Sequence, residues 1–196
     1  DDSPSKRLIN IIYNYEFINS SSTQSETKIL NKIIVFHMNR VMFDFKYKDI
    51  NEISSYDLIA NILSSLILEK FNENNIYFFE MVINKHIDSF GMHKSYNILE
   101  HAKYLNNLNE LKNIFLFFNE KFSDKIENKI IKMTSILNQY FHLDGTVPLF
   151  NGSNNNYISI IYDLLNKEEY LKSRKFSNSK NGLAFFSDNS KKLFFD

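Results

Sequence analysis

Cysteine and tryptophan are absent from this 196-residue chain, and it has only four glycines and two prolines. The lack of cysteine excludes disulfides, thiolate chemistry and Cys-based zinc sites, but it leaves the redox compartment open because a chain this long needs no covalent staples. β-Sandwiches and β-barrels contain many turns, which are rich in Gly and Pro, so the shortage of these two residues favours long helices. We therefore expect a mainly all-α fold.

An excess of charge of one sign is also missing, since 23 Lys and Arg balance 23 Asp and Glu. These totals do not indicate the basic surface that nucleic-acid binding needs, so no nucleic-acid partner is expected. No apolar run approaches the roughly 18 residues of a membrane-spanning helix, so no membrane span is expected either. The first residues lack the pattern of a secretory signal, and the location stays open between cytoplasm and periplasm.

The residues that are abundant are apolar and aromatic: 43% of the chain is hydrophobic, with 19 Phe and 11 Tyr, which predicts a packed interior. Thr23 and Glu26 form a predicted capping box at the start of a long helix. Its apolar stripe comprises Leu30, Ile34, His37, Val41 and Phe45. Ser54 or Ser55 opens a helix buried on a wide face, and Asn97 caps the helix with the longest apolar row.

The tail of the chain changes character. Two apolar runs within Gly182–Asp196, separated by a polar turn, predict a β-hairpin. An isolated hairpin is marginally stable in water, so we expect the natural protein to continue past Asp196 into a larger sheet. The sequence thus predicts a helical domain over residues 1–175 and the start of a truncated β-domain over residues 176–196.

Two segments between strong helices collect polar, ring-bearing and turn-forming residues: Gly91–Asn97 and Phe141–Ser153. Loops held on a rigid scaffold are where binding and catalytic groups tend to lie. The histidines outside these loops, His37, His86 and His101, lie on or beside helical stripes and are interpreted as packing residues. No His-x-x-x-His spacing occurs, so neither a metal nor a cofactor is expected.

Three segments resemble bacterial heparinase II/III-like polysaccharide lyases. Gly91–Asn97 resembles the family's "GGHxSRNP" segment, and Phe141–Asn155 is similar to its "F-R-H-x-D-G-x-x-x-L-F-N-G" segment. The closing Gly182–Asp196 resembles the entry into the family's β-sandwich. Their order and spacing make the set more specific than any one motif, although Met92 and Tyr96 stand where the family has Gly and Arg.

The resemblance implies an incomplete α/α toroid of antiparallel helix pairs, followed by a β-sandwich, and β-elimination of a uronic-acid-containing polysaccharide. Such a lyase neutralises the uronate carboxylate, removes the C5 proton and protonates the departing oxygen. The resemblance carries over His93 as a catalytic residue and Ser95, Asn97, His142, Asp144 and Asn151 as substrate-binding residues. Tyr96, which replaces the family's Arg, is a second catalytic candidate because a phenol can act as acid or base. As a fragment the chain is expected to be inactive alone, and its partner would be an anionic polysaccharide.

Each of these residues also has a structural interpretation. His93 could simply fix helix packing, and Tyr96 could be a packing residue. Asn97 is first an N-cap worth roughly 1 kcal/mol to its helix, and Asp144 begins a turn. Asn151 would clamp a loop. The alternative function is therefore a non-catalytic helical module that binds glycan or a partner protein, in which the departures at Met92 and Tyr96 mark lost chemistry.

Overall fold

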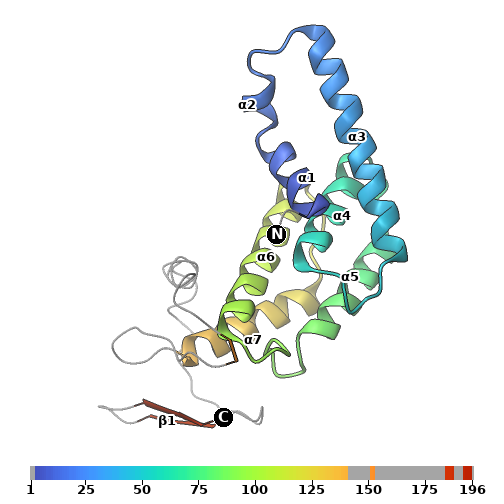
Figure 1. The fold of residues 1–196 in the computed structure, drawn as a ribbon. Helices are drawn as coiled ribbons and strands as arrows, with labels where there is room; N and C mark the ends of the chain where they lie inside the picture. Colours follow the sequence, from blue (N-terminus) through green and yellow to red (C-terminus); the bar gives the residue numbers. More distant parts are fainter. Residues whose placement is uncertain (1–2, 141–150, 153–183, 188–191, 196) are drawn as a thin grey trace. The chain divides into compact units, whose positions relative to one another are not determined.

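The computed structural model describes residues 3–140, 151–152, 184–187 and 192–195. Within them the fold is mainly helical, as the composition predicts (Figure 1). The helices are α1 (Pro4–Tyr13), α2 (Tyr15–Asn19), α3 (Gln24–Tyr47), α4 (Ser55–Ile67), α5 (Glu73–His86), α6 (Ile98–Phe117) and α7 (Asp124–Gln139).

The chain divides into two compact units. The first comprises Asp1–Val82 with Phe117–Asn119, and the second comprises Ile83–Leu116 with Glu120–Asp196. The boundary predicted between residues 175 and 176 lies outside the described residues.

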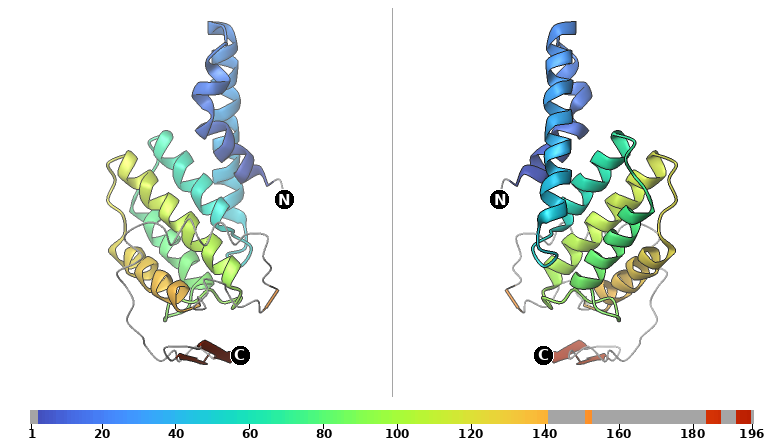
Figure 2. Two further views of the ribbon diagram at one scale, coloured as in Figure 1. Left: turned by 90° about the vertical axis from the view of Figure 1, so that its left-hand side faces the viewer. Right: turned by 90° about the vertical axis from the view of Figure 1, so that its right-hand side faces the viewer.

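In the first unit, α4 is the central helix. Of the two serines predicted to cap it, Ser54 is the N-cap, and it forms a capping box: Ser54 accepts a hydrogen bond from the amide of Asp57, while the Asp57 side chain accepts one from the amide of Ser54. Every α4 residue from Asp57 to Leu66 is buried, which confirms the predicted wide buried face. Helices α1 and α3 both pack on α4, and α1 with α2 runs back beside α3 (Figure 1; Figure 2).

Helix α3 begins at the predicted capping box, with Thr23 as N-cap and Glu26 closing the box. Within its predicted stripe Ile34 and Val41 are buried, whereas Leu30, His37 and Phe45 are half-buried. A second apolar row stays exposed along the same helix and comprises Ile29, Ile33, Phe36, Phe43 and Tyr47. The helix therefore packs along one narrow stripe.

In the second unit, α6 supplies most of the core. Its buried residues include Ile98, Leu105, Leu108, Leu111 and Phe115, as its periodicity predicts. Helix α7 packs its buried stripe of Ile126, Ile130, Met133 and Leu137 into the same unit. The 2.9 Å contact between the buried His101 ring of α6 and the Met133 carbonyl joins these two helices.

The apolar residues Phe79, Ile83 and Ile87 continue a helical period that predicts a helix as far as Phe90. This prediction is wrong at its end, because α5 stops at His86. The next residue, Ile87, pairs with His93 in an isolated antiparallel bridge. The Asp88 carboxylate accepts the amide N–H groups of Phe90, Gly91 and Met92 at 2.8 to 2.9 Å. A side chain that satisfies three amides supports a compact turn in place of the last helical turn.

Near the C-terminus, β1 (Ala184–Ser187) and β2 (Lys192–Phe195) pair antiparallel, with Ala184 opposite Phe195 and Ser187 opposite Lys192. That they open a β-sandwich stays a prediction. Among the described residues, no helix has the length and apolar character needed to cross a bilayer.

Candidate functional site

The candidate site lies in the second unit, on the loop that joins α5 to α6. This loop is anchored on α7: Lys129 donates to the Ile87 carbonyl at 2.9 Å and Lys132 to the Ser89 carbonyl at 3.0 Å. Gly91 has φ of +101°, and a Cβ there would lie 2.6 Å from Cβ of Lys132. The loop therefore needs glycine at this position both for its backbone conformation and for its close approach to α7.

His93 lies in a cluster of rings. Its centroid is 6.1 Å from that of His86, in stacked orientation, and 5.5 Å from that of Tyr104. The rings of His86 and Tyr104 are also 5.5 Å apart. Helix α5 contributes His86, its last residue, and α6 contributes Tyr104, so the loop places His93 against side chains of two different helices.

The protonation state of His93 follows from this environment. Burial and, to a smaller extent, the nearby His86 lower the pKa of His93, the carboxylate of Glu100 opposes them, and the net pKa is about 4. The ring is therefore neutral near pH 7. Its Nδ1 lies 2.8 Å from Oγ of Ser95 and accepts the amide N–H of Ser95 at 3.3 Å. With Nδ1 as acceptor, the ring proton resides on Nε2.

Tyr104 is deeply buried, and burial raises the pKa of its phenol. Among the described residues its hydroxyl has no hydrogen-bond partner. A buried hydroxyl left unsatisfied costs on the order of 1–3 kcal/mol, so it is a candidate for function. The sequence interpretation missed Tyr104 because it lies in the apolar row of α6, where an aromatic residue is ordinarily core.

His101 holds the loop through a hydrogen bond to the backbone of His93. It is fully buried, and burial lowers the pKa of His101 to about 4 although its bond to Met133 opposes the shift. Its two ring nitrogens are both used, Nδ1 by the amide of His93 at 3.3 Å and Nε2 by the Met133 carbonyl at 2.9 Å. The structure thus supports the interpretation of His101 as a packing histidine, and it also makes His101 the support of His93.

The second predicted segment reaches the first through Asn151. The Asn97 side-chain amide donates to the Asn151 carbonyl at 2.8 Å, and the Asn151 side-chain amide donates to the Tyr96 carbonyl at 3.2 Å. Both Tyr96 and Asn151 have positive φ, 52° and 51°. These reciprocal bonds confirm that Asn151 clamps a loop.

Asn97 is also the N-cap that its position predicts. Its Oδ1 accepts the amides of Leu99 and Glu100 at 2.9 and 3.2 Å, so oxygen and nitrogen of its side chain are both engaged within the chain. Tyr96 is 38% exposed, which leaves its ring open to a ligand. Met92, at the position of a family glycine, is buried, and its sulfur lies 3.9 Å from the Tyr140 hydroxyl.

Five predicted site residues, His93, Tyr96, Ser95, Asn97 and Asn151, are therefore gathered in one region of the described structure. His142 and Asp144 lie outside the described residues. Within the described ranges, no group of three or more His, Cys, Asp or Glu side chains is placed to hold a metal ion.

Comparison with known proteins gives no relative. No protein-family model, no curated protein and no solved structure matches the chain.

Proposed function

We propose that this chain is the helical part of a polysaccharide lyase resembling the heparinase II/III family, which cleaves uronic-acid-containing glycans by β-elimination. In this proposal the helices form an incomplete α/α toroid of antiparallel pairs, and β1 with β2 begins a β-sandwich. The observation that supports it best is the pair of hydrogen bonds that Asn151 forms, one with the Asn97 side chain and one with the Tyr96 carbonyl. They join the two segments to which the resemblance assigns catalytic and substrate-binding residues.

His93 is the proposed base. In the neutral ring the nitrogen that carries no proton is the one that acts as base. This is Nδ1, which contacts Ser95, or Nε2 if the ring is in the other tautomer. A base with a pKa near 4 is weak at neutral pH. A bound uronate carboxylate would favour the imidazolium and raise this pKa toward the working pH, so substrate binding itself would make His93 a stronger base.

The remaining residues divide the other tasks. The half-exposed phenol of Tyr96 is the proposed acid that protonates the departing glycosidic oxygen. Ser95 orients the His93 ring through the 2.8 Å contact between Oγ and Nδ1. Asn97 positions the loop, because its side chain already serves as N-cap and clamp. His142 and Asp144 are proposed to contact the sugar hydroxyls of the anionic polysaccharide.

The test is turnover by the complete natural reading frame. The protein is mixed with alginate, heparan sulfate, hyaluronate and polygalacturonate, and the ultraviolet absorbance of the unsaturated product is followed. His93→Ala is expected to lower kcat at least ~100-fold. His37→Ala serves as the matched control, since it removes a half-buried histidine of the other unit. An unchanged kcat in the His93 variant removes its role as base.

A specific observation favours the second candidate, a non-catalytic helical module that binds glycan or a partner protein. Met92 is part of the core, and the oxygen and nitrogen of the Asn97 side chain both form hydrogen bonds within the chain, so these two motif positions have structural roles. The same experiment separates the candidates. Binding of a glycan in affinity electrophoresis without any product on the whole panel supports the module and contradicts the lyase.

A further inference from the structure

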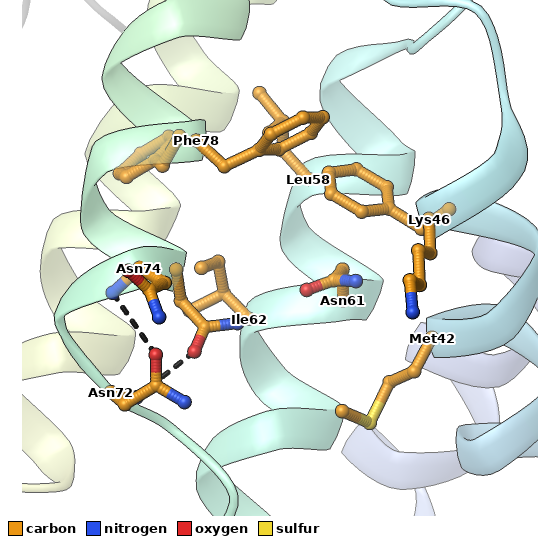
Figure 3. Close-up of a pocket in the computed structure, with 11 residues that line it drawn as sticks. Met42, Lys46, Leu58, Asn61, Ile62, Asn72, Asn74 and Phe78 are labelled. Carbon is orange, nitrogen blue, oxygen red and sulfur yellow. Dashed lines mark hydrogen bonds between the residues drawn. The ribbon is translucent and has the colours of Figure 1, made fainter.

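The first unit contains a cavity that is not lined by any residue of the candidate functional site. Its volume is about 480 Å³, within the range of small-molecule sites. It opens between α3, α4 and the start of α5, and most of its wall is apolar (Figure 3). The apolar lining residues are Met42, Phe45, Leu58, Ile62, Phe78 and Phe79.

A buried amide points into this cavity. Asn61 belongs to α4 and is only 6% exposed, and its side chain reaches the open space between the helices (Figure 3). In the described part of the chain, its amide makes no hydrogen bond with another group. Asn61 is not among the described residues whose polar atoms are wholly closed off from solvent without a partner, so its amide faces the cavity. There it is available to a ligand that enters between the helices.

One cation lines the same cavity. Lys46 extends from α3 with its ammonium directed toward the opening (Figure 3). Within the described ranges it forms no ion pair, and the contact found for it is with the Tyr47 ring, 5.6 Å from the centroid. Among the described residues that line the cavity there is no Asp or Glu. The charge of the site is therefore positive, and its polar groups are one ammonium and several amides.

Two of the other side-chain amides that line the cavity, those of Asn72 and Asn75, have structural partners. Asn72 accepts the amide of Asn74 at 3.0 Å, and Asn75 accepts the amide of Asn72 at 2.9 Å, so these residues cap the start of α5. These two asparagines therefore have a structural role that needs no ligand. Asn61 has no such capping role, because it lies in the interior of α4, and the proposal depends on this residue.

We propose that this cavity binds a small carboxylic acid with an apolar or aromatic body. The apolar body would fill the space between the Phe and Leu side chains, where its burial supplies most of the binding free energy. The carboxylate would pair with Lys46 and accept a hydrogen bond from Nδ2 of Asn61. This ligand satisfies the buried amide and the cation together, which neither an alkane nor a cationic ligand does.

The experiment uses the full chain with octanoate and phenylbutyrate as probes, and octanol and phenylbutanol as their neutral equivalents. Binding is followed by calorimetry and by ¹⁵N NMR of the Asn61 side-chain amide. A dissociation constant on the order of 0.1–1 mM is expected for the acids, with the alcohols binding about tenfold more weakly. Equal binding of acids and alcohols, or no shift of the Asn61 amide at millimolar acid, would overturn the proposal.

Variants test the two polar groups. Lys46→Gln is expected to weaken octanoate binding about tenfold and to leave octanol unchanged, whereas Lys32→Gln, on the same helix and away from the cavity, should change neither. Asn61→Asp keeps the shape but repels a carboxylate, so it should abolish acid binding. Equal effects of Lys46→Gln and Lys32→Gln would contradict the assignment.

Asn61→Leu provides a readout independent of any ligand. Because the amide has no partner in the unbound protein, replacing it with an apolar side chain should raise Tm by a few degrees while weakening octanoate binding. A lowered Tm would mean that Asn61 already has a structural role, and it would remove the basis of the proposal. Far-UV circular dichroism verifies that each variant is folded.

Discussion

The backbone N–H of His93 donates to Nδ1 of His101 at 3.3 Å, while the opposite ring nitrogen of His101 lies 2.9 Å from the Met133 carbonyl. A carbonyl only accepts, so Nε2 of His101 carries the proton and Nδ1 is the acceptor. One buried imidazole in a single tautomer therefore connects the candidate loop to α7. Protonation of His101 would place a second N–H against the His93 amide and break this connection.

The first prediction concerns His101 and pH. Its pKa in the folded state is about 4, below the ordinary 6.5. Between these pH values the unfolded chain binds more protons, so the free energy of unfolding falls as pH falls from 6.5 toward 4. The contribution of His101 is roughly 3 kcal/mol over the full range. Urea denaturation at several pH values measures it.

His101→Leu isolates that contribution. The variant should lose roughly 2–4 kcal/mol at pH 7, because the His93 amide and the Met133 carbonyl are left buried without partners. It should also show a smaller drop in stability between pH 6.5 and 4. His37→Leu is the control. An unaltered pH slope in His101→Leu would show that His101 does not titrate in this range.

The second prediction compares two glycines with positive φ. Gly91→Ala adds a Cβ at 2.6 Å from Cβ of Lys132 and 3.0 Å from its backbone carbon, so the loop must move off α7. Among the described residues, a Cβ at Gly152 meets nothing closer than 3.8 Å, so Gly152→Ala adds there only the backbone strain of its φ of +80°. We expect the free energy of unfolding, measured by thermal unfolding, to fall by at least ~3 kcal/mol in Gly91→Ala and by about 1 kcal/mol in Gly152→Ala. Equal losses would mean that the loop is not pressed against α7.

The third prediction separates the two uses of Asn97. Asn97→Ser keeps an oxygen that caps α6 but removes the amide donor to Asn151, whereas Asn97→Ala removes both. Asn97→Ala should therefore be less stable than Asn97→Ser by about 1 kcal/mol. In both variants the backbone amide of Gly152 should exchange with deuterium faster. Unchanged exchange would show that the Asn97 bond does not hold the second segment.

Local signals account for what could be predicted of the fold. The capping boxes at Thr23 and Ser54 and the cap at Asn97 depend on side chains and amides within three residues, so sequence alone predicts these helix starts correctly. The end of α5 was mispredicted because the apolar period continues past it. What stops the helix is the Asp88 turn, whose three amide bonds carry no periodic signal.

In the candidate site, too, local features could be predicted from the sequence, whereas contacts between distant segments could not. His93 and Asn151 were identified by their place in loops, yet the two segments are 54 residues apart and only the structure pairs Asn97 with Asn151. Tyr104 and Asn61 escaped notice for another reason. Each lies at a position where helical periodicity predicts an ordinary core residue, and only burial without a partner distinguishes it.

The last prediction concerns the buried carboxylate of the first unit. Burial raises the pKa of Asp57, but hydrogen bonds from Lys48, Ser5 and Ser54 outweigh it, and the net pKa is lowered from 3.8. These bonds measure 2.7 Å to Lys48, 2.6 Å to Ser5 and 2.8 Å to the Ser54 hydroxyl, so one side chain ties α1 and the end of α3 to α4. Asp57→Asn should cost roughly 2–3 kcal/mol at pH 7.

A group whose folded pKa is lowered stabilises the protein above its unfolded value and stops doing so as pH falls through the folded value. The difference in unfolding free energy between wild type and Asp57→Asn should therefore be constant above about pH 5 and shrink below 3.8. Asp124→Asn breaks the exposed 3.4 Å pair with Lys121, and it should change stability by less than about 0.5 kcal/mol at any pH. A difference between wild type and Asp57→Asn that stays the same down to pH 2 would show that the Asp57 charge does not stabilise the first unit, because protonation would then remove nothing.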